Sequence, residues 1–108
     1  MNYKPDKWVI VKVITNEVIY KVFGCWSGSY LEGNSWRMNS GIVSIKDTGD
    51  TYEFVGYSGS TYICRKTCYG SHPYASIILN GMINDASKQD VVIEILDKDT
   101  DFLNLKYE

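Results

Sequence analysis

The segment from residue 21 to residue 45 contains the residue types that could bind a ligand. It reads KVFGCWSGSYLEGNSWRMNSGIVSI and combines aromatic side chains with four glycines, an arginine and two asparagines. Glycine lets a ligand approach the backbone closely, and an aromatic ring beside it offers a surface for stacking. An arginine guanidinium can bind phosphate in bidentate geometry. Together these residue types suit a nucleotide-like or phosphate-bearing ligand.

We therefore predict a binding site in which each residue type has one role. Aromatic rings would stack on the ligand, which contributes about 1–3 kcal/mol per base in single-strand binders. Basic side chains would bind phosphate, and amide or hydroxyl groups would contact polar edges. The predicted ligand-binding residues are Trp26, Tyr30, Trp36, Arg37, Asn39, Ser40, Tyr57, Ser58, Arg65 and Lys66. The structural alternative is that the tryptophans fill the core and Arg37 is a surface charge.

A zinc site fits the sequence less well. Cys64, Cys68 and His72 recur at intervals of four, and Cys25 would be a fourth ligand. This spacing differs from the two close ligand pairs of structural zinc sites. Free cysteines that behave as small buried hydrophobes are the simpler interpretation. We predict no metal and no cofactor.

A catalytic site also has weak support. Residues 56–60 read GYSGS, which differs from the G-x-S-x-G nucleophile motif because Ser60 replaces the last glycine. The motif also needs a strand–turn–helix context, whereas these residues are expected at a hairpin tip. An imidazole-based mechanism would depend on His72 alone. The acidic residues 97–101 resemble a solvated turn more than a carboxylate pair. We expect binding without catalysis, with a small nucleotide-cleaving enzyme as an alternative.

The elements that would position these residues are mainly β-strands. Residues 7–15 are apolar on both alternating sets, which predicts a central strand covered on both faces. Within the strand predicted at residues 35–45, Trp36 should face inward and Arg37 outward. Gly24 indicates a bulge or a close backbone approach. The other predicted strands are 17–26, 51–58, 60–66, 90–96 and 102–107.

One helix is predicted at about residues 73–86. Pro73 suits the first helical position, where its missing N–H does no harm. Tyr74, Ile77, Ile78 and Met82 recur at helical spacing and would face the sheet. The sequence therefore predicts one domain, residues 1–108, of mainly β (α+β) structure: a strongly bent antiparallel sheet or small barrel of about six to seven strands with the helix packed on it. The strand order stays open.

Composition indicates a globular protein. The chain has 108 residues, 44% of them hydrophobic, and a net charge of −2. Residues 1–46 carry six Lys or Arg against three acids, and residues 85–108 carry three against seven. The basic excess is too small to predict general nucleic-acid binding. No apolar run is long enough for a membrane span, and the first residues contain no signal-peptide core. The odd cysteine count suits a reducing compartment. We therefore expect a cytoplasmic protein.

Residues 21–70 resemble small uncharacterised accessory proteins of tailed bacteriophages. The residues that carry the resemblance are Trp26, Tyr30, Trp36, Arg37, Asn39, Ser40, Gly41, Tyr57, Ser58, Gly59, Ser60 and Tyr62. The resemblance implies a role in the host cytoplasm against host defence, either by sequestering an immune signal or by blocking a host protein. The last third of the chain departs from the resemblance.

We therefore expect a non-enzymatic, phage-type counter-defence protein that sequesters a small nucleotide-derived ligand, such as an immune second messenger. Tight retention is often achieved by burying a ligand between subunits, so we expect a homo-oligomer, most simply a two-fold dimer. The alternative is an inhibitor of a host defence or nucleic-acid-binding protein. Tyr, Trp and Arg are also enriched at protein interfaces, and the acidic C-terminal region would then mimic nucleic acid.

Overall fold

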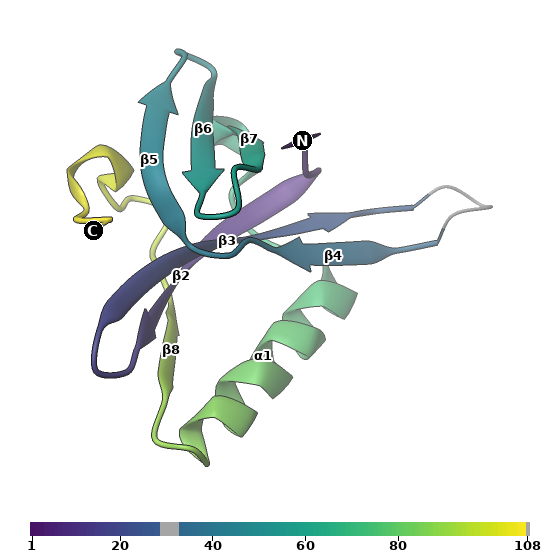
Figure 1. Ribbon diagram of the computed structural model, residues 1–108. Helices are drawn as coiled ribbons and strands as arrows, with labels where there is room; N and C mark the ends of the chain where they lie inside the picture. The colour runs from purple at the N-terminus through teal and green to yellow at the C-terminus, as the bar shows by residue number, and fades with distance from the viewer. Residues whose placement is uncertain (29–32, 108) are drawn as a thin grey trace.

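The computed structural model describes residues 1–28 and 33–107, and it is mainly β with one helix (Figure 1). The strands are β1 (Asn2–Tyr3), β2 (Lys7–Ile14), β3 (Val18–Trp26), β4 (Ser35–Met38), β5 (Ile42–Asp47), β6 (Thr51–Gly56), β7 (Thr61–Arg65) and β8 (Val92–Ile95). The helix is α1 (Pro73–Ser87), and two short 3-10 helices are η1 (Lys66–Cys68) and η2 (Phe102–Asn104). In this part of the chain no helix is long and apolar enough to span a membrane.

The strands form two four-stranded sheets. Sheet A has the order β1-β7-β6-β5, and sheet B has the order β4-β3-β2-β8. Neighbouring strands are antiparallel, except that β1 lies parallel to β7. The predicted mainly β fold with one packed helix is confirmed, but the sheets do not close into a barrel.

Sheet B is the middle layer of the molecule. Alternation along β2 directs Trp8 and Ile10 toward sheet A, and Val9 and Val11 toward α1. Figure 1 shows α1 on one side of β2–β4 and the strands β5–β7 on the other. The prediction of a central strand covered on both faces is therefore confirmed.

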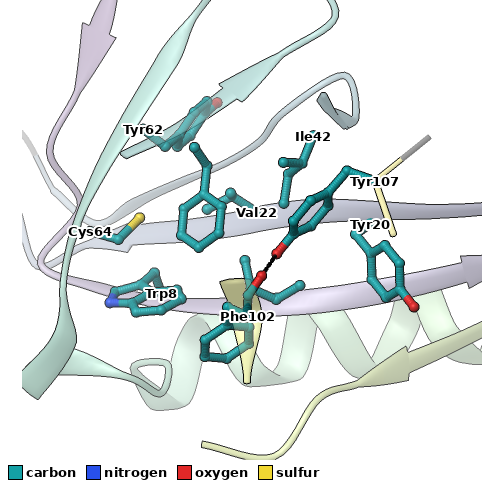
Figure 2. Packing of buried hydrophobic residues seen from close by; sticks show 10 residues of the cluster. Trp8, Tyr20, Val22, Ile42, Tyr62, Cys64, Phe102 and Tyr107 are labelled. Carbon is teal, nitrogen blue, oxygen red and sulfur yellow. Dashed lines mark hydrogen bonds between the residues drawn. The ribbon is translucent and has the colours of Figure 1, made fainter. Parts of the chain in front are cut away.

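An aromatic cluster fills the space between the two sheets (Figure 2). The Trp8 ring lies 4.7–6.3 Å, centroid to centroid, from four other aromatic rings, those of Tyr52, Phe54, Tyr69 and Phe102. Its indole N–H donates to the carbonyl of Arg65 at 2.7 Å, so the one polar atom of this buried side chain is paired. Trp8 is therefore the centre of this core.

The smaller core lies between sheet B and α1. Ala75 and Leu79 of α1 are buried there with Val9, Val11, Phe23 and Cys25. Ile77, predicted to face the sheet, is 73% exposed. The prediction was wrong at this residue because α1 is rotated so that positions 75, 79, 82 and 83 meet the sheet.

The predicted strand 35–45 is divided between the two sheets. At Asn39 the chain leaves β3: the Asn39 N–H donates to the carbonyl of Val22 at 3.0 Å, and the Asn39 Oδ1 accepts the Val22 N–H at 2.9 Å. Gly41 then turns with φ 134°, and β5 joins sheet A. Strands that pass from one packed sheet to the other make such corners. We call residues 39–41 the corner.

Two further predictions were wrong. Residues 2–3 were expected to be a polar lead, but they form β1 at the edge of sheet A. Residues 102–107 were expected to be a strand, but they begin with η2 and bury only Phe102 and Tyr107. The Tyr107 hydroxyl donates to the carbonyl of Phe102, which closes this segment on itself instead of pairing it with a sheet (Figure 2).

Candidate functional site

A groove of about 390 Å³ lies where the N-terminal segment, residues 3–6, meets β3 and β4. We call it the Trp26 groove. It is lined by Tyr3, Asp6, Trp26, Ser27, Gly28, Gly33, Ser35 and Arg37. It therefore joins two predicted ligand-binding residues, an aromatic ring and a guanidinium, with several residues that were not predicted.

Strand register places Trp26 and Arg37 on one face of sheet B. Arg37 pairs with Gly24, and Trp26 is two residues further along β3, so both side chains project from the same side. Gly24 makes room on this face for the N-terminal segment. A Cβ at residue 24 would lie 2.9 Å from the Cβ of Pro5, so the predicted close approach at this glycine is confirmed.

The N-terminal segment is held on both walls of the groove. The Trp26 indole N–H donates to the carbonyl of Lys4 at 2.9 Å. The Arg37 guanidinium carbon lies 4.5 Å from the centroid of the Tyr3 ring, in a cation–π arrangement. Tyr3 itself packs on Tyr62 of the aromatic cluster, at 5.0 Å between centroids. These contacts position the guanidinium along the groove.

Asp6 gives the groove a carboxylate. Its Oδ2 accepts the backbone N–H of Ser27 at 2.7 Å. The remaining carboxylate oxygen can accept hydrogen bonds from ligand hydroxyl groups, and the charge opposes phosphate nearby. The groove therefore combines a guanidinium, which attracts anions, with a carboxylate, which attracts hydrogen-bond donors.

Behind the groove, the start of α1 is tied to β3 and β4. The Tyr74 hydroxyl donates to the carbonyl of Trp26 at 2.5 Å and also contacts the carbonyl of Ser35. Burial raises the pKa of Tyr74, so the hydroxyl stays protonated as a donor. The Cys25 thiol accepts the backbone N–H of His72 at 3.5 Å, and burial raises its pKa too, which disfavours the nucleophilic thiolate.

Two of the predicted ligand-binding residues are directed away from the groove. Trp36 pairs with Cys25 and lies on the opposite face of sheet B, where its ring stacks on Phe23 at 5.5 Å between centroids. One ligand cannot stack on Trp26 and Trp36 together. Asn39 is buried at the corner, where its Oδ1 accepts the Val22 N–H. This hydrogen bond fixes the path of the backbone where the chain leaves β3.

The other predicted residues are spread over the molecule. At the corner, the Ser58 N–H donates to the Ser40 Oγ at 3.0 Å, and Tyr57 lines a separate pocket of about 550 Å³. Arg65 lines another pocket, on the outer face of sheet A. Lys66 forms an ion pair with Asp47 at 2.8 Å, and this hydrogen bond lowers the pKa of the Asp47 carboxyl. Tyr30 lies outside the described residues.

The sequence pattern did not identify Tyr3, Asp6, Ser27 and Ser35 as site residues. Tyr3 and Asp6 belong to a lead segment with no periodicity, and they reach the groove because β1 pairs with β7 from the other half of the chain. Such a long-range parallel contact leaves no local signal. Ser27 and Ser35 lie inside residues 21–45; Ser27 follows Trp26 directly in sequence, whereas Ser35 is its partner across β3 and β4.

The cysteines and the histidine fall into two groups. Cys25 and His72 lie on the α1 side of sheet B, whereas Cys64 and Cys68 belong to the aromatic cluster on the other side. Within residues 1–28 and 33–107, no three His, Cys, Asp or Glu side chains come close enough together to hold a metal ion.

Replacing Gly24 with alanine should test the packing of the N-terminal segment. The new Cβ would meet the ring of buried Pro5, and overpacking of this kind costs about 1–3 kcal/mol of unfolding free energy. Gly81→Ala is the control: nothing lies within 4 Å of its Cβ position on α1, so the helix should be stabilised by about 0.5–1 kcal/mol. Urea unfolding measures both. Equal stability of the two variants would contradict the close Pro5–Gly24 contact.

Comparison of the chain with protein-family models, with curated proteins and with solved structures found no match in any of the three. The groove itself is therefore the basis for inferring a function.

Proposed function

We propose that the protein binds a small nucleotide-like ligand in the Trp26 groove. The observation that supports this is that Trp26, Tyr3 and Arg37 line one groove, with the guanidinium stacked over the Tyr3 ring. Aromatic surfaces bind any base by stacking, and a guanidinium binds phosphate through paired hydrogen bonds. The base would therefore stack near Trp26 and the phosphate would bind Arg37.

The rest of the groove suits the sugar and the polar edges of such a ligand. Asp6 offers a free carboxylate oxygen for ribose hydroxyls, and Ser27 and Ser35 offer hydroxyl groups. A ligand can approach the backbone closely at Gly33, where nothing lies within 4 Å of the Cβ position. The volume of about 390 Å³ lies in the range of small-molecule sites.

Binding without catalysis is the activity that these residues support. Of the residues lining the groove, Asp6 is the one with a carboxylate, and one of its oxygens already accepts the Ser27 N–H. Sequestration needs no proton transfer. It is also the role implied by the resemblance to phage accessory proteins. The counter-defence role, the homo-oligomer and the cytoplasmic location stay predictions from the sequence.

The test is a thermal-shift screen of nucleotides followed by titration of two groove variants. Trp26→Ala removes the stacking surface and Arg37→Met removes the charge, and each should weaken nucleotide binding about 10-fold or more, which corresponds to about 1.4 kcal/mol. Trp36→Ala is the matched control, because that ring lies on the opposite face of sheet B. Its dissociation constant should stay within about 2-fold of wild type.

Two results would overturn the proposal. The first is a Trp26→Ala protein that folds and still binds nucleotide with unchanged affinity. The second is an equal loss of affinity in Trp26→Ala and Trp36→Ala, since this would indicate that neither ring contacts the ligand directly. Circular dichroism of each variant establishes that it is folded before its affinity is compared.

A further inference from the structure

A second pocket, of about 400 Å³, lies on the outer face of sheet A and is lined by Lys4, Thr51, Ile63 and Arg65. It contains two cations and a hydroxyl group. Both Lys4 and Arg65 are exposed, and the described residues place no carboxylate within 4.0 Å of either side chain. We call it the Lys4 pocket.

Strand register shows that positive charge collects on this face of sheet A. Lys46, Glu53 and Ile63 are partners across β5, β6 and β7, and Thr51 is the partner of Arg65. Glu53 is the acidic residue of these outward positions, and it lies directly opposite Lys46, which compensates its charge. The remaining outward positions on the sheet are Asn2, Ser44, Val55 and Thr61. Three cations against one carboxylate give this face a positive charge in a chain whose net charge is −2.

The Lys4 pocket and the Trp26 groove are separated by a single backbone segment, residues 3–6. The carbonyl of Lys4 accepts the Trp26 indole N–H at 2.9 Å, while the Lys4 side chain lines the other pocket. The carbonyl of Asp6 accepts a hydrogen bond from Arg65 Nη2 at 3.3 Å, while the Asp6 side chain lines the groove. Residues 4–6 therefore contribute groups to both sites. A ligand can therefore cross this segment and contact both sites.

We propose that the Lys4 pocket is a second phosphate subsite of the same ligand site, and that the ligand carries at least two phosphates separated along a chain, as in a linear dinucleotide. This inference rests on the proposed function. The first nucleotide occupies the Trp26 groove with its phosphate near Arg37. The chain then crosses residues 3–6, and the next phosphate lies between Lys4 and Arg65, where the Thr51 hydroxyl can donate a hydrogen bond.

The test compares nucleoside monophosphates with 5′-phosphorylated linear dinucleotides of the same bases, by isothermal titration. Wild-type protein should bind at least one dinucleotide about 10-fold more tightly than the corresponding monophosphate, and this advantage should shrink as salt increases. The double variant Lys4→Met/Arg65→Met should lose the advantage while its affinity for the monophosphate stays within about 2-fold. Lys88→Met/Lys98→Met removes the same charge from exposed positions elsewhere and should keep the advantage.

The possible outcomes distinguish a failure of the second-subsite proposal from a failure of the proposed binding in the Trp26 groove. If monophosphate and dinucleotide bind equally and Trp26→Ala weakens both, the second subsite is wrong and the groove stands. If Lys88→Met/Lys98→Met loses the advantage as fully as the pocket variant, general charge attraction explains it and the subsite is wrong. If no probe binds, or Trp26→Ala changes nothing, the proposed function is overturned and the subsite with it.

Discussion

Gly41→Ala is expected to lower the free energy of unfolding by about 2–6 kcal/mol. Gly41 has φ 134°, a conformation that residues with a Cβ rarely adopt, and strain of this kind costs about 1–3 kcal/mol. The new Cβ would also lie 2.7 Å from two ring carbons of Tyr57 and 3.1 Å from Cγ2 of Ile19. Overpacking adds about 1–3 kcal/mol.

The cost is large because Gly41 is part of the corner that joins the two sheets. Its carbonyl accepts the Tyr57 N–H at 2.9 Å, which anchors the start of β5 beside the end of β6. A shift of Gly41 to relieve the clash would therefore disturb sheet A, and a shift of Asn39 on the other side would leave the Val22 N–H without its acceptor. Neither the backbone strain nor the steric clash at residue 41 can therefore be relieved without disturbing these hydrogen bonds.

Urea unfolding of Gly41→Ala, Tyr57→Ala and the double variant separates the clash with the Tyr57 ring from the rest of the cost. Because Tyr57 is 55% exposed, its removal alone should cost little, and the ring clash should disappear in the double variant. The part of the Gly41→Ala cost that remains is the backbone strain together with the close contact to Cγ2 of Ile19. A Gly41→Ala protein within about 0.5 kcal/mol of wild type would contradict the geometry of the corner.

Trp8→Ala is expected to cost about 3–5 kcal/mol, the range for removing a large aromatic side chain from a core. Trp8 is 1% exposed and is surrounded by the rings of Tyr52, Phe54, Tyr69 and Phe102. Removing the indole also takes the hydrogen bond at 2.7 Å from the carbonyl of Arg65 at the end of β7. The variant should therefore loosen both the packing between the sheets and the end of one strand.

Trp36→Ala is the matched control for this prediction. The same atoms are removed, but Trp36 is 39% exposed and contacts one aromatic ring, that of Phe23, among the described residues. We expect a cost of about 1 kcal/mol, typical of a partly exposed position. Urea unfolding with circular dichroism compares the two variants. Equal costs would mean that the assignment of Trp8 as the core tryptophan is wrong.

The Trp26 groove was predicted from the sequence only in part. Trp26 and Arg37 were both proposed for one site, and the register of β3 with β4 brings them to one groove. Trp36, one residue before Arg37, was proposed for the same site, although the alternation used to place it predicts the opposite face. Successive residues of a strand project to opposite faces, so Trp36 and Arg37 cannot both line a groove on one face.

The sequence alone determined the mainly β fold, the helix beginning at Pro73, the burial of residues 8–11 on both faces of β2 and the close approach at Gly24. These features depend on alternation, turn residues and small residues that act over a few neighbouring positions. Tertiary structure alone decided that the chain crosses between sheets at the corner, that Tyr3 and Asp6 reach the groove, and that Lys4 meets Arg65. The reason is that each depends on which distant segments pair, and a local pattern specifies a strand without specifying its neighbour.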